Sequence, residues 1–273
     1  MVELFENEKM GENRRSSKGN QLKWKSGDIW YKADYTGYEG LAEYMVSALL
    51  SFSDLEEKEY IVYRTEEIRY RQTTYLGCSS VNFLPADCQM VTLERLFHDC
   101  YGESLTKRIY SFVEINDRVQ FLVNQTERMT GLRDFGVYMV KLLTLDALFL
   151  NEDRHMHNIA VLLDANGKFH YCPFFDHGAA LLADTTMDYP LTADVESCMQ
   201  NVKAKTFCRS FDDQLDAAEE LYGRHIQFSF TWKDIVGLLE QERYYPKEVK
   251  NRVEWVLTEQ RRRYAYLFYK NQY

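Results

Sequence analysis

Apolar and polar residues change their spacing near Pro85. Before it, short segments rich in β-branched and aromatic residues alternate with turn residues, which is typical of strands. Ser26-Gly27-Asp28 separates two such segments and predicts a hairpin. One segment differs, because its apolar residues between Leu41 and Leu49 recur at helical spacing. This part of the chain is therefore predicted to form a sheet with one helix.

Long helical patterns follow Pro85. Residues 104–126 and 132–150 carry apolar side chains three and four positions apart, and the same spacing returns after Pro246. One interruption has strand character, with two short apolar segments on either side of Asn166-Gly167, a dipeptide that favours a tight hairpin turn. The second part of the chain is therefore predicted to be helical with one inserted hairpin.

These patterns predict an α+β fold with two lobes, a small β-rich N-lobe and a larger helical C-lobe. The polar, charged residues 1–15 are expected to form a loose tail. The N-lobe is expected to cover residues 16–84 and the C-lobe residues 85–273. A chain of 273 residues is long enough to build a core in both lobes.

The composition limits which partners the chain is expected to bind and in which cellular compartment it is expected to occur. A net charge of −9 offers no basic face for phosphate contacts, so direct nucleic-acid binding is not expected. The six cysteines include no C-x-x-C pair, and the chain starts without a secretory leader. No apolar run reaches the roughly 18 residues that span a bilayer. We therefore expect a cytoplasmic protein with reduced thiols and no membrane partner.

Ionisable residues gather where the hydrophobic pattern is densest, in LFLNEDRHMHNIAVLLDANGKFHYCPFFDHGAALL at 148–182. Asp153 precedes Asn158 by five residues, the offset between the catalytic Asp and the metal-binding Asn of protein kinases. Asp176, two residues before Gly178, takes the place of the metal-binding Asp in D-F-G. Phosphoryl transfer needs such a set, because one carboxylate orients the attacking hydroxyl while other oxygens bind divalent ions. We expect these three side chains to converge.

A nucleotide site also needs a cation for the phosphates and a carboxylate that holds this cation. Lys32 ends a predicted strand, and Glu39 and Glu43 lie one turn apart on the same face of the following helix. Both carboxylates are within reach of Lys32, and the sequence does not decide between them. Lys32 with one of the two is the predicted phosphate-binding pair.

Three motifs occur in a fixed order along the chain. SSKGNQLK at 16–23 has the pattern S-x-x-G-x-Q-x-K, and PFFD, which ends at Asp176, has the pattern P-x-x-D. Between them, LNEDRHMHNIAV has the pattern N-x-D-x-H-x-x-N, with matches at Asn151, Asp153, His155 and Asn158. Together they resemble the phosphate loop, the metal-binding segment and the catalytic loop of the HipA-like serine/threonine kinases.

The resemblance implies a protein-kinase-like fold, ATP and Mg²⁺ as cofactors, and an adenine-binding hinge near SSVNFLP. It assigns Asp153 as the catalytic base and Asn158 and Asp176 as metal ligands. His155 is implied to brace the catalytic loop, and Glu39 to support the phosphate-binding lysine. The residues implied to bind ATP are Gly19, Gln21, Lys23, Lys32, Glu43, Val81 and Phe83.

The resemblance also implies regulation and partners. Family members can phosphorylate a serine of their own phosphate loop, which corresponds to Ser16 here, and about two added negative charges beside the nucleotide would close the site. The chain begins almost at this loop and is expected to lack the N-terminal module of longer family members, which some truncated relatives obtain from a separate small protein. Two roles stay open for a kinase that acts on a protein substrate: the toxin of a split toxin-antitoxin system, with a small antitoxin or N-terminal-module partner, and a stand-alone kinase.

Three other interpretations stay open. DRHMHNI also resembles phosphoinositide kinases, so a lipid or another small molecule is an alternative acceptor. A pseudokinase that binds nucleotide without turnover would carry the same motifs. A metal-dependent hydrolase would instead use imidazoles and carboxylates as metal ligands. Its candidates are Asp153, His155, His157, His170, Asp176 and His177.

Overall fold

The computed structural model describes residues 1–10 and 21–269. The chain divides into two compact units. Unit 1 consists of Met1–Asn82, Phe175–Val202 and Gln227–Tyr273, and unit 2 consists of Phe83–Phe174 and Lys203–Ile226. The first change of unit lies close to the predicted boundary at residue 84, whereas two later segments of the predicted C-lobe belong to unit 1. The predicted lobe ranges themselves stay a prediction.

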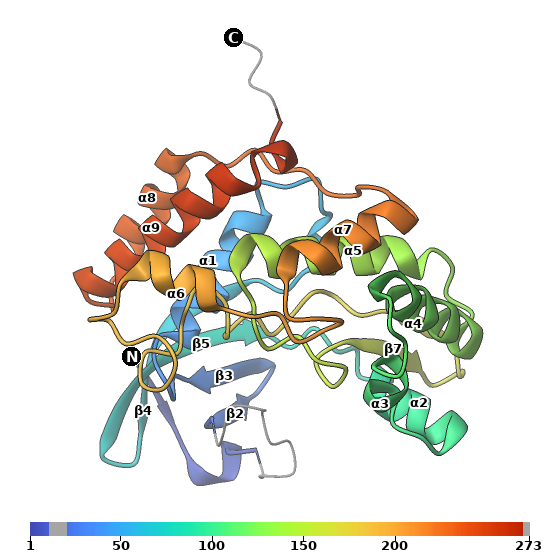
Figure 1. Ribbon diagram of the computed structural model, residues 1–273. Coiled ribbons are helices and arrows are strands. Elements are labelled where there is room, and N and C mark those ends of the chain that lie inside the picture. Colours follow the sequence, from blue (N-terminus) through green and yellow to red (C-terminus); the bar gives the residue numbers. More distant parts are fainter. Residues whose placement is uncertain (11–20, 270–273) are drawn as a thin grey trace. The chain divides into compact units, whose positions relative to one another are not determined.

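Unit 1 contains a five-stranded sheet in the order β1-β4-β5-β3-β2, with the middle strands visible in Figure 1. The pairs are antiparallel except for β1 and β4, which are parallel. The predicted hairpin is confirmed, because Ser26 pairs with Ile29 and Gly27 adopts a φ of +58° in the turn. The strands are β1 (Val2–Leu4), β2 (Lys23–Ser26), β3 (Ile29–Ala33), β4 (Tyr63–Tyr70) and β5 (Thr73–Val81).

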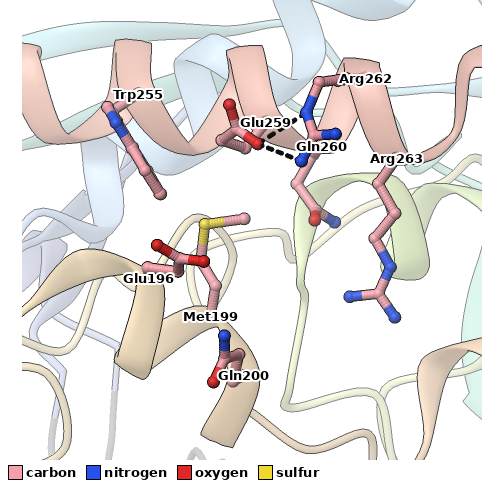
Figure 2. Close-up of a pocket in the computed structure, with 8 residues that line it drawn as sticks. All are labelled: Glu196, Met199, Gln200, Trp255, Glu259, Gln260, Arg262 and Arg263. Atoms are coloured by element: carbon pink, nitrogen blue, oxygen red, sulfur yellow. Dashed lines mark hydrogen bonds and ion pairs between the residues drawn. The ribbon is translucent and has the colours of Figure 1, made fainter.

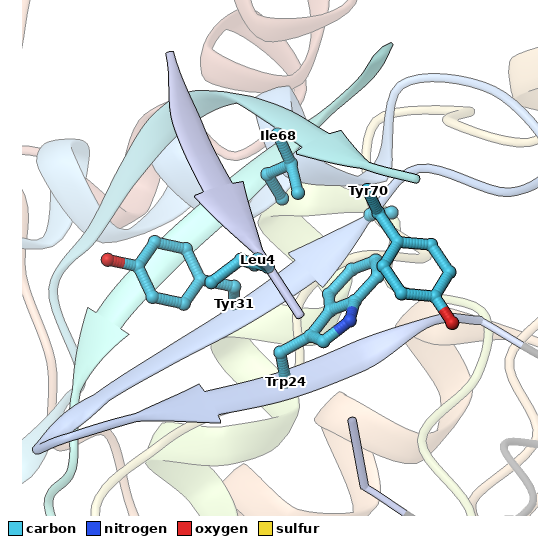
Figure 3. Close-up of a cluster of buried hydrophobic side chains, with 6 residues drawn as sticks. Leu4, Trp24, Tyr31, Ile68 and Tyr70 are labelled. Carbon is cyan, nitrogen blue, oxygen red and sulfur yellow. The ribbon is translucent and has the colours of Figure 1, made fainter. Parts of the chain in front are cut away.

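The expectation of a loose tail over residues 1–15 is wrong for Val2–Leu4, which forms strand β1. Leu4 is buried in a cluster with Trp24, Tyr31 and Ile68, shown in Figure 3. The Trp24 ring meets the edge of Tyr70 with the centroids 5.2 Å apart. Burial of the Leu4 side chain, together with the pairing of β1 with β4, holds this strand in place.

The helix predicted from Leu41 to Leu49 is α1 (Glu39–Leu50), and it lies on the sheet of unit 1. Two glycines allow close approaches here. A Cβ at Gly40 would lie 2.4 Å from the carbonyl carbon of Gly77, and a Cβ at Gly77 would lie 2.1 Å from the carbonyl oxygen of Lys32. Bare backbone at Gly40 therefore brings the helix down onto β5, and bare backbone at Gly77 leaves room for the neighbouring strand β3.

Three further helices complete the described part of unit 1: α6 (Val195–Asn201), α8 (Trp232–Gln241) and α9 (Lys247–Arg263). Helices α8 and α9 lie side by side (Figure 1). The buried Arg252 of α9 donates to the carbonyl oxygens of Tyr189 and Pro190 at 2.6 and 2.7 Å. Tyr38 donates its hydroxyl to Leu181 O at 2.6 Å. These bonds attach the segment that follows Asp176 to the other segments of unit 1.

Unit 2 is mainly helical, as predicted for the residues after Pro85. The helical pattern over 104–126 forms two helices, because residues 110–114 leave the helical conformation. The apolar pattern over 132–150 forms the buried helix α5, which packs against α7. The helices are α2 (Leu93–Tyr101), α3 (Leu105–Ile109), α4 (Ile115–Thr130), α5 (Phe135–Phe149) and α7 (Phe211–Tyr222).

The hairpin predicted at Asn166-Gly167 is confirmed as β7 (Ala160–Asp164) and β8 (Phe169–Tyr171), with Gly167 at a φ of +77°. A third strand, β6 (Cys88–Thr92), pairs antiparallel with β7 and was not predicted. Within residues 1–10 and 21–269, no helix combines the length and the apolar character that crossing a membrane requires.

Candidate active site

The predicted phosphate-binding lysine lies in a partly buried cluster of charges within unit 1. Lys32 Nζ is 2.7 Å from Glu43 Oε1 and 2.9 Å from Asp176 Oδ1. The Glu43 side chain is 2% exposed, and its second oxygen accepts a hydrogen bond from the backbone N–H of His177 at 2.8 Å. Glu43 therefore fixes both the ammonium group and the turn that carries Asp176.

The structure decides between the two candidate glutamates. Glu39 accepts hydrogen bonds from the N–H groups of Thr36 and Gly37 at 2.7 and 3.1 Å, and from the Thr36 hydroxyl at 2.8 Å. Its carboxylate therefore satisfies N–H groups that precede α1. The carboxylate that pairs with Lys32 is Glu43, one turn further along the helix.

The charges of this cluster determine the pKa of Lys32. Burial acts to lower this pKa, but the negative charges of Asp176 and Glu43 outweigh burial and hold it well above its ordinary value. Lys32 is therefore an ammonium ion at neutral pH. Lys23 lies opposite Lys32 in the ladder between β2 and β3, and burial lowers its pKa. The charge of Asp176 opposes that shift, and the charge of Lys32 adds to it.

Asp176 lies at a sharp turn of the backbone. It adopts a φ of +61°, a left-handed conformation that Asp tolerates better than most residues. A Cβ at Gly178 would lie 3.4 Å from the Cβ of Glu39, which is an ordinary contact, so the space there does not require glycine. The turn leaves the Asp176 side chain 28% exposed, which suits a group that has to bind a further ion.

The predicted catalytic loop lies in unit 2, between α5 and β7. Asn158 Nδ2 donates to the carbonyl oxygen of Asp153 at 2.9 Å, and the N–H of Asn158 donates to His155 O at 2.8 Å. The offset of five residues between Asp153 and Asn158 therefore closes a compact loop. Because the amide nitrogen is used inside the loop, the amide oxygen is the atom that a cation would use. An oxygen ligand fits Mg²⁺.

The Asp153 carboxylate faces two basic side chains of unit 2. Its Oδ1 lies 3.5 Å from Lys205 Nζ, and its Oδ2 lies 3.9 Å from His155 Nε2. The His155 ring lies edge-on to that of His157, with the centroids 5.7 Å apart. His155 therefore lies beside the predicted base, and its bracing role stays a prediction. Lys205 comes from a distant segment that the sequence did not associate with the loop.

A buried ion pair beneath this loop was also missed by the sequence analysis. Arg154 Nε lies 3.1 Å from Asp146 Oδ2, and both side chains are almost fully buried, with 1% and 0% exposed. Asn151 donates to the same carboxylate at 2.9 Å, so the first residue of the loop motif is structural. A charged residue inside the apolar helix LLTLDALF was the available signal.

Asp176 belongs to unit 1, whereas Asp153 and Asn158 belong to unit 2. The expected convergence of the three therefore stays a prediction. Val81 ends β5 with 65% exposed, and Phe83 opens the first segment of unit 2. Gln21 and Lys23 are described, while Ser16 and Gly19 of the phosphate loop lie outside the described residues. In the described ranges, no three His, Cys, Asp or Glu side chains are grouped to hold a metal ion.

Unit 1 also has a hollow of about 490 Å³ between α6 and α9, shown in Figure 2. In this hollow, Arg262 Nη2 lies 2.8 Å from Glu259 Oε2 and forms an ion pair with it. None of the predicted site residues lines this hollow. Its lining residues are Glu196, Met199, Gln200, Trp255, Glu259, Gln260, Arg262 and Arg263.

Comparisons with known proteins support the fold. No protein-family model matches the sequence, and no curated protein matches it. The chain is similar in structure to the proinflammatory kinase CtkA of Helicobacter pylori, with a TM-score of 0.58 and 14% identity over 96% of this chain and 94% of that one. It also matches HipA of Shewanella oneidensis MR-1, solved with HipB and operator DNA, with a TM-score of 0.46 and 12% identity over 94% and 67%.

At 14% identity the match to CtkA establishes the fold, and it does so over nearly the whole length of both chains. The chain therefore has the α+β, two-lobed protein-kinase-like fold that was predicted from the sequence.

Proposed function

We propose that the chain is an ATP-dependent kinase that transfers the γ-phosphoryl group to a serine or threonine hydroxyl. The observation that carries this proposal is the partly buried Lys32, held at once by Glu43 and by Asp176. A lysine fixed by a helix carboxylate and placed beside a metal-binding carboxylate is the phosphate-binding arrangement of kinases. The kinase-like fold supports the same function.

Each residue would have a definite task. Lys32 would bind α- and β-phosphate oxygens, and Lys23 would add a second positive charge from the neighbouring strand. Asp153 would accept the proton of the attacking hydroxyl, whose oxygen bonds to the γ-phosphorus as the bond to ADP breaks. Asn158 and Asp176 would hold Mg²⁺, which neutralises charge on the phosphoryl oxygens when bound. Val81 and Phe83 would flank the adenine-binding backbone.

The phosphate acceptor and the protein partners are also part of this proposal. A Ser/Thr protein substrate, modification of Ser16, and a small antitoxin or N-terminal-module partner are consequences of the motif resemblance. A lipid or small-molecule acceptor, a pseudokinase and a hydrolase are the outcomes that experiments have to separate. The order of tests is therefore nucleotide binding first and phosphate transfer second.

Calorimetric titration with ATP and Mg²⁺ tests the binding step. We expect saturable one-to-one binding by the parent chain, and a loss of at least about tenfold in affinity for Asp176→Ala, because a metal ligand is removed. Glu248→Ala is the matched control, since it removes one exposed negative charge from unit 1. Absence of binding by the folded parent, or equal affinity of Asp176→Ala and the control, would contradict the proposal.

A further inference from the structure

The side chain of Lys205 lies at the carboxylate of the predicted base, 52 residues away in the sequence. Its Nζ is 3.5 Å from Asp153 Oδ1, and the Lys205 side chain is 46% exposed while that of Asp153 is 12% exposed. The Lys205 side chain therefore meets the carboxylate while about half of its surface stays exposed. A lysine ammonium has three N–H donors, so it can bind Asp153 and an anionic group together.

The basic residue that follows Asp153 directly cannot fill this role. Arg154 is 1% exposed, its Nε binds the carboxylate of Asp146, and its Nη1 donates to Asn158 O at 3.1 Å. Removing that guanidinium from Asp146 would leave a buried charge uncompensated. Arg154 thus stabilises the loop from beneath, and the cation beside Asp153 comes from elsewhere in unit 2.

The loop that carries Lys205 is fixed to the catalytic loop. Thr206, the next residue, is buried and donates its hydroxyl to the carbonyl oxygen of Arg154 at 2.7 Å. Arg118 Nη1 donates to Phe207 O at 2.7 Å, and Tyr110 donates its hydroxyl to Lys205 O at 3.3 Å. Because the backbone is held at Lys205 and at the two residues after it, the base of the Lys205 side chain is fixed beside the catalytic loop, which reduces the ordering needed to place the ammonium group.

We propose that Lys205 is a catalytic residue of the transfer step, whose ammonium group binds an oxygen of the γ-phosphoryl group and the carboxylate of Asp153 at once. This inference rests on the proposed kinase function. As the hydroxyl proton passes to Asp153 and the oxygen bonds to phosphorus, the bond to the leaving ADP breaks with its electron pair. Lys205 keeps its proton and stabilises the charge on the transferring group.

The test measures ADP formation by the full chain with Mg²⁺ and ATP, together with ATP affinity and the thermal unfolding midpoint. We expect Lys205→Met to lower kcat by about 100-fold or more, because a donor aimed at the transferring group is lost. Its unfolding midpoint is expected to stay near that of the parent, because Lys205 is exposed and lies 3.5 Å from its partner Asp153. Its ATP affinity is expected to stay near that of the parent, because the lost donor acts mainly on the charge of the transferring group. Lys205→Arg is expected to retain kcat within about tenfold, since the positive charge is kept.

Lys203→Met is the matched control, because Lys203 is an exposed lysine of the same loop two residues earlier. Equal kcat for Lys205→Met and Lys203→Met, in an active parent, would overturn the role of Lys205 and leave the kinase proposal standing. A loss of ATP affinity or of the unfolding midpoint that accounts for the whole effect would also overturn it. A folded parent that neither binds ATP nor forms ADP would overturn the kinase proposal itself.

Discussion

Asp34 connects three parts of unit 1 through one side chain. Its Oδ1 accepts the backbone N–H of Gly40 at 2.6 Å, and its Oδ2 accepts the hydroxyl of Tyr245 at 2.7 Å. Burial, strengthened by the negative charge of Glu39, raises the pKa of Asp34 from 3.8 to about 7. The end of β3, the start of α1 and the residues before α9 are thus joined by a carboxyl group that titrates near neutral pH.

This pKa predicts a pH dependence of stability. Between pH 3.8 and about 7 the folded state holds a proton on Asp34 that the unfolded state has released, so the free energy of unfolding falls as the pH rises. The Asn side chain in Asp34→Asn does not titrate. The free energy of unfolding of this variant, relative to that of the parent, is therefore expected to increase from pH 4 to pH 8. Urea unfolding at several pH values measures the difference. A difference that stays constant with pH would show that Asp34 does not titrate in this range.

At the scale of single residues, the sequence predicted which residue types form the site better than it predicted which side chains contact each other. Lys32 and two candidate glutamates followed from strand and helix spacing, but the choice of Glu43 depends on how close α1 lies to the sheet. The burial of Arg154 within the predicted catalytic loop was not predicted. Lys205 was not a candidate, because a contact over 52 residues leaves no mark in local spacing.

At the scale of elements, the contact between α1 and the sheet determines the position of Glu43. Gly40 and Gly77 leave backbone against backbone, and Gly77 lies opposite Ala33 in the ladder, next to the pair formed by Lys32 and Cys78. A side chain at Gly40 would push the helix outward and lengthen the distance between Lys32 and Glu43, whereas a side chain at Gly77 would meet the backbone of β3. The position of the helix therefore depends on the absence of a side chain at Gly40.

Gly40→Ala tests this placement. The added Cβ would lie 2.4 Å from the backbone of Gly77, so we expect a loss of about 1–3 kcal/mol in the free energy of unfolding. Gly237→Ala in α8 is the control, because no atom lies within 4 Å of its added Cβ, and alanine should stabilise that helix by about 0.5–1 kcal/mol. Denaturant unfolding of both variants measures the two values. Equal effects of the two substitutions would show that the close approach is not needed.

The elements that the sequence predicted are those with a strong local period, such as α1, α5 and the two hairpins. The elements it missed are short strands whose stability comes from their partners. Strand β1 has three residues and depends on β4, and β6 (Cys88–Thr92) runs directly into α2 without a turn residue to mark it. Both strands form because they pair with strands that are distant in the sequence, β1 with β4 and β6 with β7.

At the scale of the whole molecule, the predicted site residues are divided between the two compact units. Unit 1 carries Lys32, Glu43 and Asp176, and unit 2 carries Asp153 and Asn158. A fold shared with CtkA at 14% identity shows that hydrophobic patterning can keep an architecture while most side chains differ. The motifs were predictable because the chemistry requires particular residue types at fixed offsets. The acceptor was not, because nothing in those offsets depends on it.

The central claim is that both sets of residues are needed for phosphate transfer. Intact-mass measurement after incubation with ATP and Mg²⁺ tests it most directly, with Ser16→Ala to locate the acceptor. We predict that the parent gains phosphate, that Lys32→Met in unit 1 does not, and that Asp153→Asn in unit 2 does not while it still binds ATP, because only the proton acceptor is lost. A parent that binds ATP and gains no phosphate, or Asp153→Asn gaining phosphate at the parent rate, would contradict this account.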